Sequence, residues 1–305
     1  MSVEPGRSAA VNVDIDSLYL YYRLHGLDEE RATNVIWERG VPRFAELFAS
    51  YGIRATFFVV GADLERWPRA MEGAKALVAE GHELGNHTWS HPYDFSKGDD
   101  TSIGEEIDRA HTIISEAAGR EICGFRAPGY NMSEEVYRSL AQRGYLYSSS
   151  LFPSPPYMLA KWGVMASMLL RGKRSEAIWG NPSMMFSSRA PHHRRSVLEM
   201  PITVLPGIRF PLIGTTLSLM GTTGYRVIRP LLKQAKFLNL EFHGIDLIDL
   251  ETDGIDGTLA AQRDLRIGLE SKLETFSALM EDVSNGWNVR TLEELAPQFK
   301  GPRAR

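Results

Sequence analysis

The stretch from residue 54 to residue 85 decides the fold class of this chain. It begins with RATFFVVG (residues 54–61), an apolar run of aromatic and β-branched residues that is typical of a buried strand. PRAMEGAKALVAEGHELG (residues 68–85) follows, and this pattern predicts a helix that a glycine terminates. A buried strand that leads directly into a helix is the repeating unit of a parallel sheet.

The same alternation continues on both sides of this stretch. Further strands are predicted at AVNVDID (residues 10–16), CGFRAPGY (residues 123–130), KFLNLEFHGIDL (residues 236–247) and NVRTL (residues 288–292). Further helices are predicted within residues 31–52, 101–119 and 133–144, and a long charged helix at about residues 258–284. The alternation predicts an α/β fold whose parallel sheet is open or closed into a barrel. Residues of about 150–235 are rich in Pro, Met and Gly, so we expect an elaboration of one domain that spans residues 1–305.

Composition narrows the classes of function. The 305 residues are 43% hydrophobic and 24% charged, which is enough apolar material for a sizeable core. The net charge of -4 gives no reason to expect a nucleic-acid partner. Cys123 is the only cysteine, which excludes an intrachain disulfide and a thiolate metal site. The first residues lack a secretory signal pattern and no apolar run reaches the length of about 18 residues of a membrane span, so we expect a cytoplasmic protein.

Two histidines and two aspartates suggest a metal site. GNHTWSHP (residues 85–92) places His87 and His91 four residues apart, but such pairs are common without a metal. In VNVDIDS (residues 11–17), Asp14 and Asp16 share one face of a strand, where their charges repel unless a cation or a proton offsets them. The alternative is an exposed strand end with one solvated and one capping aspartate. Together, Asp16, His87 and His91 form a two-histidine, one-carboxylate set with open positions for water, and Asp14 is left beside it as a base.

Five motifs resemble a known family in their order along the chain: VDIDS (residues 13–17), RATFFVVG (54–61), GHELGNHTWSHP (81–92), FRAPGY (125–130) and LEFHG (240–244). They resemble the polysaccharide deacetylases, the NodB-homology or carbohydrate esterase family 4 enzymes, over residues 11–150 and 237–295. The resemblance implies an irregular (β/α)7-type barrel and hydrolysis of N-acetyl or related amides. It also implies one divalent metal, which we expect to be zinc, with cobalt, manganese, nickel or iron as alternatives. Residues 40–61 are similar to the branch that deformylates lipid-linked aminoarabinose.

The resemblance assigns roles to single residues. Asp14 corresponds to the catalytic base, and Asp16, His87 and His91 to the metal ligands. A metal there would lower the pKa of bound water and polarise the amide oxygen.

Three later residues complete the implied site. Arg126 corresponds to the arginine that pairs with the base, and His243 to the general acid that protonates the leaving amine. The backbone N–H of Tyr130 is predicted to contact the oxyanion. A surface salt bridge for Arg126 and a hydrogen-bonded core position for His243 are the alternatives.

The chain departs from the family pattern at two places. Where many members carry an acidic residue that orients the late histidine, GYLYSSSLFP (residues 144–153) offers only serines. Two residues before His243, where relatives often have an aliphatic residue, this chain has Glu241. Alternation along residues 237–246 predicts that Asn239, Glu241 and His243 face into the barrel. There Glu241 could pair with a structural arginine or serine in the barrel or contact the substrate's amino group, and either Glu241 or Asp246 could orient His243.

The expected substrate is an intracellular amino sugar on a lipid or nucleotide carrier, or a small soluble amide. Residues 157–174 and 207–232 are apolar, and the first of these segments ends in basic residues. They could therefore form a cover next to the metal, within residues 157–232, that contacts lipid at the inner face of the membrane. The alternative is that these two segments only pack over the barrel and do not contact lipid. A non-heme Fe(II) enzyme and a non-catalytic glycolipid-binding module are the other classes that these residues allow.

Overall fold

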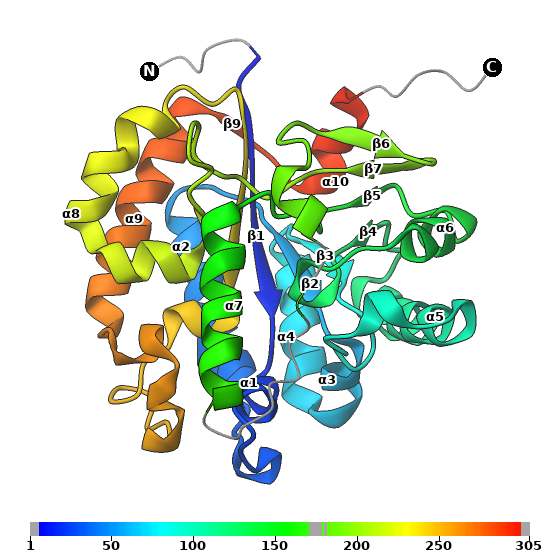
Figure 1. Ribbon diagram of the computed structural model, residues 1–305, viewed down its shortest axis with the longest axis horizontal. Coiled ribbons are helices and arrows are strands. Elements are labelled where there is room, and N and C mark those ends of the chain that lie inside the picture. The colour runs from blue at the N-terminus through cyan, green and yellow to red at the C-terminus, as the bar shows by residue number, and fades with distance from the viewer. Residues whose placement is uncertain (1–5, 171–178, 180–181, 300–305) are drawn as a thin grey trace.

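A parallel sheet forms the centre of the molecule (Figure 1). The computed structural model describes residues 6–170, 179 and 182–299. Within them, seven strands run parallel in the order β7-β5-β4-β3-β2-β1-β8. Their bounds are β1 Ser8–Ile15, β2 Thr56–Val59, β3 Glu83–Asn86, β4 Gly124–Phe125, β5 Tyr147–Ser148, β7 Val197–Glu199 and β8 Phe237–His243. β6 (His192–Arg194) pairs antiparallel with β7, and β9 (Asn288–Val289) pairs parallel with β1.

The sheet curls into a half-barrel, so that its two ends approach each other. The chain segment after β7 reaches β8 through two hydrogen bonds, from Thr203 N to Asn239 O at 2.9 Å and from Asn239 N to Thr203 Oγ1 at 2.7 Å. Asn239 Nδ2 also donates to Met200 O at 2.7 Å. We call this contact between residues 200–203 and Asn239 the seam. The predicted α/β fold of the irregular barrel kind is confirmed.

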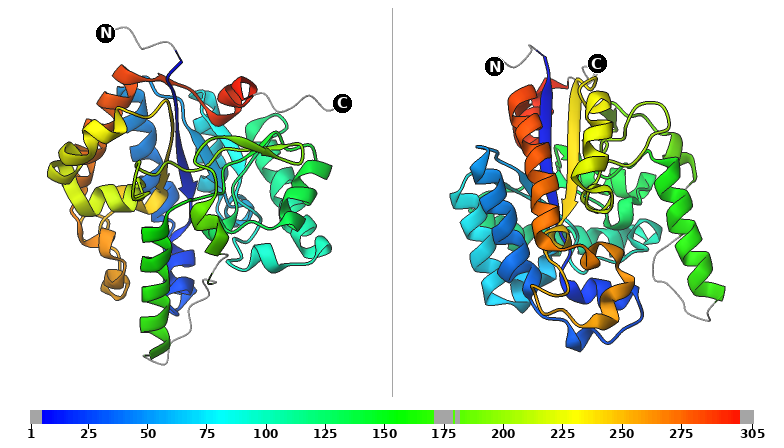
Figure 2. Two further views of the ribbon diagram at one scale, coloured as in Figure 1. Left: turned by 45° about the horizontal axis from the view of Figure 1, so that its top comes forward. Right: turned by 90° about the vertical axis from the view of Figure 1, so that its left-hand side faces the viewer.

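Helices surround the curled sheet (Figure 1, Figure 2). The longer ones are α2 Val41–Ser50, α4 Pro68–Ala79, α5 Asp100–Ala118, α7 Pro155–Leu170, α8 Gly214–Leu232 and α9 Leu269–Gly286. The shorter ones are α1 Leu18–Leu24, α3 Gly61–Arg66, α6 Glu134–Gln142 and α10 Leu292–Leu295. α7 stands out from the rest of the molecule in the right-hand view of Figure 2. No helix among the described residues is long and apolar enough to span a bilayer.

Alternation along the central strands separates an apolar outer layer from a polar interior. On β1, Val11, Val13 and Ile15 join the main core, while Asn12 and Asp14 point into the half-barrel. On β8, Leu238, Leu240 and Phe242 belong to the same core. The rings of Phe44 on α2 and Phe276 on α9 lie 5.6 Å and 4.9 Å from that of Phe242. The polar face of each strand is thereby directed to the interior, as the sequence alternation predicts.

Two expectations need correction or extension. The predicted helix at 258–284 begins only at Leu269, because residues 257–266 form two 3-10 turns, the first of them capped by the Asp256 side chain. The Asp249 side chain accepts from the Leu269 N–H at 2.7 Å and so fixes the start of α9 at this later residue.

The segment of about 150–235 contributes β7 to the main sheet besides α7 and α8. The basic end of the apolar segment 157–174 lies outside the described residues.

Candidate active site

The residues singled out from the sequence meet at the carboxyl ends of the strands. Asp14 and Asp16 lie at the end of β1, and His87 directly follows β3. Arg126 directly follows β4, and His243 is the last residue of β8. Carboxyl ends of parallel strands share one edge of a sheet, and strand register places Asp14 beside His243. The remaining candidates also reach this edge: His91, Tyr130 and Glu241.

Asp16, His87 and His91 form a compact set of potential metal ligands. Their ligand atoms all lie within 4.8 Å of one another, and all three residues are buried. Asp16 Oδ1 lies 3.3 Å from His87 Nε2 and 3.5 Å from His91 Nε2. Atoms about 2.0–2.2 Å from a tetrahedral zinc ion would be separated by roughly 3.3–3.5 Å. Within the described part of the chain Asp16 Oδ1 is buried without a hydrogen-bond partner, so the set fits a divalent cation.

Protonation favours cation binding at two of these ligands. His87 Nδ1 lies 2.8 Å from Arg126 O, a contact that keeps the proton on Nδ1 and leaves Nε2 free toward Asp16. Burial lowers the pKa of His91 to about 4, so this ring is neutral near pH 7. Burial alone would raise the pKa of Asp16, but His91 and His87 hold it well below its usual range. The carboxylate and the neutral His91 ring are the forms that bind metals.

The loop between the two histidines is held in a strained conformation. Thr88 and His91 have φ angles of 65° and 55°, in the left-handed region that residues other than glycine rarely adopt. Asn86 Oδ1 accepts from the Thr88 N–H at 2.8 Å. Glu106 on α5 accepts from both the N–H and the hydroxyl of Ser90, at 2.8 Å each. These contacts offset the strain and set the direction of His91.

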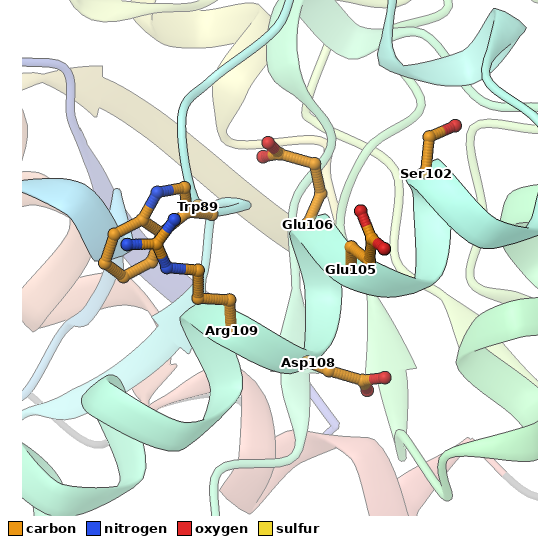
Figure 3. Close-up of a pocket in the computed structure, with 6 residues that line it drawn as sticks. All are labelled: Trp89, Ser102, Glu105, Glu106, Asp108 and Arg109. Atoms are coloured by element: carbon orange, nitrogen blue, oxygen red, sulfur yellow. The ribbon is translucent and has the colours of Figure 1, made fainter.

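A hollow of about 470 Å³ lies beside this loop (Figure 3). Arg109 crosses the ring of Trp89 there, with its guanidinium carbon 3.6 Å from the ring centre. Glu106 also lines the hollow. None of the three potential metal ligands lines it, so the hollow is distinct from the candidate active site.

Asp14 forms a buried ion pair with Arg126. Arg126 Nη1 lies 2.9 Å from Asp14 Oδ1, and neither side chain is more than 2% exposed. The same guanidinium donates to Asn12 Oδ1 at 2.5 Å and to the carbonyl and hydroxyl of Ser149 at 2.6 Å and 2.7 Å. Asp14 Oδ2 lies 3.9 Å from His87 Nε2. The arginine therefore offsets the charge of a carboxylate that sits next to the ligand set, and the surface salt bridge considered for Arg126 is excluded.

His243 is placed between the ligand set and Glu241. Its Nε2 lies 3.9 Å from Asp16 Oδ2, and its Nδ1 lies 3.0 Å from Glu241 Oε1. Burial alone would lower the pKa of His243, but Glu241, and after it Asp16 and Asp14, raise it to about 9. The ring is therefore a potential proton donor near neutral pH.

Tyr130 contacts Glu241 through its side chain. Its hydroxyl donates to Glu241 Oε1 at 2.9 Å. Its backbone N–H, predicted as an oxyanion donor, donates to Ala127 O at 3.2 Å. An oxyanion at this N–H would have to share it with that carbonyl.

Some residues that shape the site carry no sequence signal. Glu106 accepts hydrogen bonds from Ser90 in the histidine loop, although the two residues are 16 positions apart in the sequence. Asp63 accepts from the hydroxyl of Ser17, next to Asp16. Neither lies in a motif, and only the tertiary structure reveals them. A further group, Glu83, Cys123 and Glu293, has metal-ligand composition, but both Glu83 oxygens accept hydrogen bonds, from Tyr147 Oη at 2.6 Å and Thr56 Oγ1 at 2.7 Å. That group is a structural one.

The curled sheet and the residues at its carboxyl edge define a NodB-type α/β barrel. A sequence profile described as polysaccharide deacetylase matches residues 33–148. A peptidoglycan-N-acetylglucosamine deacetylase of Bacillus cereus is 31% identical over 104 residues, 34% of this chain and 46% of the relative. A peptidoglycan deacetylase of Helicobacter pylori is 31% identical over 116 residues, 37% of this chain and 38% of the relative. The chain thus spans less than half the length of these curated relatives, and what it shares with them is a polysaccharide deacetylase-like region at residues 33–148.

Solved structures agree on the fold. A candidate polysaccharide deacetylase from Mycobacterium smegmatis superposes with a TM-score of 0.63 at 17% identity, over 98% of this chain and 92% of its own. A family 4 carbohydrate esterase pseudoenzyme from Bacillus anthracis matches with a TM-score of 0.50 at 12% identity, over 95% of this chain and 65% of its own. Because the same fold includes a pseudoenzyme, activity has to be argued from the residues of the site.

Proposed function

We propose that the protein is a metal-dependent amide hydrolase that removes an N-acyl group, acetyl or formyl, from an amino sugar. One observation carries the proposal: the ligand set Asp16, His87 and His91 lies against the ion-paired Asp14 and against His243 in one buried cluster. The relatives from Bacillus cereus and Helicobacter pylori are peptidoglycan deacetylases, which supports an acylated amino sugar as the substrate class.

The chain's own residues divide the proton transfers. A divalent cation held by the ligand set, zinc in our proposal, would supply Lewis acidity at the amide carbonyl. Asp14 takes a proton from the attacking water, whose oxygen bonds to the acyl carbon, and Arg126 keeps the base in place. The C–N bond then breaks with its electron pair on nitrogen, and His243 gives that nitrogen a proton. The products are the amine and the carboxylic acid.

The proposal extends to a lipid-linked substrate met on the cytoplasmic side of a membrane. α7 supports this part, because Leu159, Val164, Leu169 and Leu170 are each between 59% and 89% exposed. A helix that is apolar on its exposed side is suited to a lipid interface. Near its other end, Tyr157 packs against Tyr130, with ring centres 5.7 Å apart, so the helix connects that surface with the site.

Two assays test these statements separately. The zinc-loaded protein is offered N-acetyl and N-formyl amino sugars, free, nucleotide-linked and lipid-linked, and released acetate or formate is measured. Asp14→Asn is the control for the first assay, and release that is equal for both proteins would contradict the proposed base. Flotation with anionic liposomes tests α7, with Leu169→Glu/Leu170→Glu as the matched variant. Failure of the protein to float, while soluble substrates are hydrolysed, would remove the membrane contact and leave the hydrolase.

The other candidate classes give different results in the same experiments. A hydrolase of small soluble amides would release acid from unlinked compounds alone. A non-heme iron enzyme would purify with iron, which elemental analysis of protein prepared without added metal detects. A glycolipid-binding module would bind the lipid-linked sugar without releasing acid.

A further inference from the structure

Three buried serines occupy the segment in which the family pattern places an acidic partner for His243. Ser149 Oγ accepts from Arg126, and Ser150 Oγ accepts from the Ala127 N–H at 2.9 Å. Ser148 Oγ lies 2.8 Å from Ser150 Oγ. The serines thus support the loop that follows β4, and this segment supplies no carboxylate to the imidazole.

Glu241 lies where such a carboxylate is needed. Side chains two residues apart on a strand share a face, and Glu241 Oε1 lies 3.0 Å from His243 Nδ1. Asp246, the other acidic residue close in sequence, accepts from the backbone N–H of His243 at 2.7 Å and so holds the main chain. This charged contact at Nδ1 leaves Nε2 as the nitrogen that lies 3.4 Å from Tyr130 Oη and 3.9 Å from Asp16 Oδ2, on the side of the ligand set.

Tyr130 fixes the position of Glu241 in turn. Its hydroxyl donates to the same Oε1 atom at 2.9 Å, and burial, followed by Glu241, raises the pKa of Tyr130 well above its usual range, so it remains a donor. The Tyr130 ring packs against Phe152 and Tyr157, with ring centres 5.2 Å and 5.7 Å away. Glu241 is fully buried, so its position is set by these contacts and not by solvent.

We infer that Glu241, anchored by Tyr130, is the positioning residue that holds the His243 ring with Nε2 toward the scissile amide. The carboxylate thus comes from the same strand as the histidine, two residues before it. This inference rests on the proposed function for its catalytic consequence, whereas the geometry of the ring is independent of it.

The first test measures the ring itself in metal-free protein. Two-bond nitrogen–proton NMR spectra identify which nitrogen of His243 is protonated, and His243→Ala assigns the signals. The spectra are recorded above pH 9, where the ring is neutral and carries one proton, and we expect that proton on Nδ1 in the wild type and a changed pattern in Glu241→Leu. Glu199→Gln is the matched control, because Glu199 is also fully buried and also accepts from a tyrosine, Tyr137 Oη at 2.9 Å. A His243 pattern that is the same in Glu241→Leu as in the wild type overturns the inference.

The second test compares two leaving groups at equal metal content. An amide needs a proton on its leaving nitrogen, whereas 4-nitrophenolate leaves without one. We expect Glu241→Leu to lower kcat for the amide by about 10- to 100-fold and kcat for 4-nitrophenyl acetate by less than about threefold, with KM unchanged. Glu241→Gln, which keeps an acceptor for Tyr130, should lie between the two proteins. Equal losses on both substrates overturn the inference; if the wild type hydrolyses neither, the proposed function fails and the NMR result still decides the role of Glu241.

Discussion

Replacing Arg126 by methionine tests whether the interior of the barrel depends on one ion pair. The change removes a fully buried guanidinium with hydrogen bonds to Asp14, Asn12 and Ser149, and leaves the Asp14 carboxylate buried without its cation. Breaking a buried pair from one side costs about 3–5 kcal/mol, a large part of the roughly 5–15 kcal/mol of a typical domain. Combining Arg126→Met with Asp14→Asn in one double variant removes this unpaired buried charge. The double variant should therefore be more stable than the sum of the two single changes predicts, by about 1–3 kcal/mol.

Urea unfolding followed by tryptophan fluorescence, in the presence of a chelator, measures these free energies of unfolding. The chelator keeps metal binding out of the comparison, because Asp14 adjoins the ligand set. Arg138→Met is the matched control, since Arg138 lies on the surface and pairs with the exposed Asp100, a pair worth about 0.2–1 kcal/mol. The reasoning is refuted if Arg126→Met costs no more than this control, or if the effects of Arg126→Met and Asp14→Asn are additive.

Three further predictions concern metal, turnover and pH. His87→Ala should lose most of the bound zinc by elemental analysis, and full retention would exclude His87 as a ligand. Asp14→Asn should keep the metal and lose about 10²- to 10⁴-fold in turnover, whereas loss of metal would make Asp14 a ligand. Burial lowers the pKa of His82 to about 4, so its contribution to stability is present above pH 6.5 and is lost as the pH falls toward 4. The wild type should accordingly lose up to about 3 kcal/mol more than His82→Gln between pH 6.5 and 4, and parallel pH profiles would contradict this assignment.

The sequence predicts the parts of the site that lie in local patterns. Asp14 and Asp16 share a face because a strand alternates, and His87 and His91 are carried by one short loop. The inward direction of Glu241 follows from the same alternation on β8. These arrangements need only the backbone geometry of one element each, which is why the sequence suffices.

Contacts between distant elements are not visible in the sequence. β7 has three residues, too few for alternation to show, and it lies in a segment whose composition suggests an insertion. Glu106 is one of several acidic residues on α5, and only packing against the histidine loop distinguishes it. The two turns at 257–266 replace a predicted helix because aspartate side chains bind nearby backbone N–H groups there.

The seam between residues 200–203 and β8 bears on how a preparation of this protein should be judged. Asn239, at the seam, accepts from Asn12 Nδ2 at 2.7 Å, and Asn12 accepts from the arginine that holds Asp14. Asp16 and His91 are not part of this chain of contacts, and His87 contacts it through the backbone carbonyl of Arg126 and not through the guanidinium. A molecule whose seam has opened would thus lose the support of its base while it still takes up a cation. The amount of bound metal per protein then overstates the fraction of catalytically active molecules in a stored sample. That fraction has to be measured by turnover.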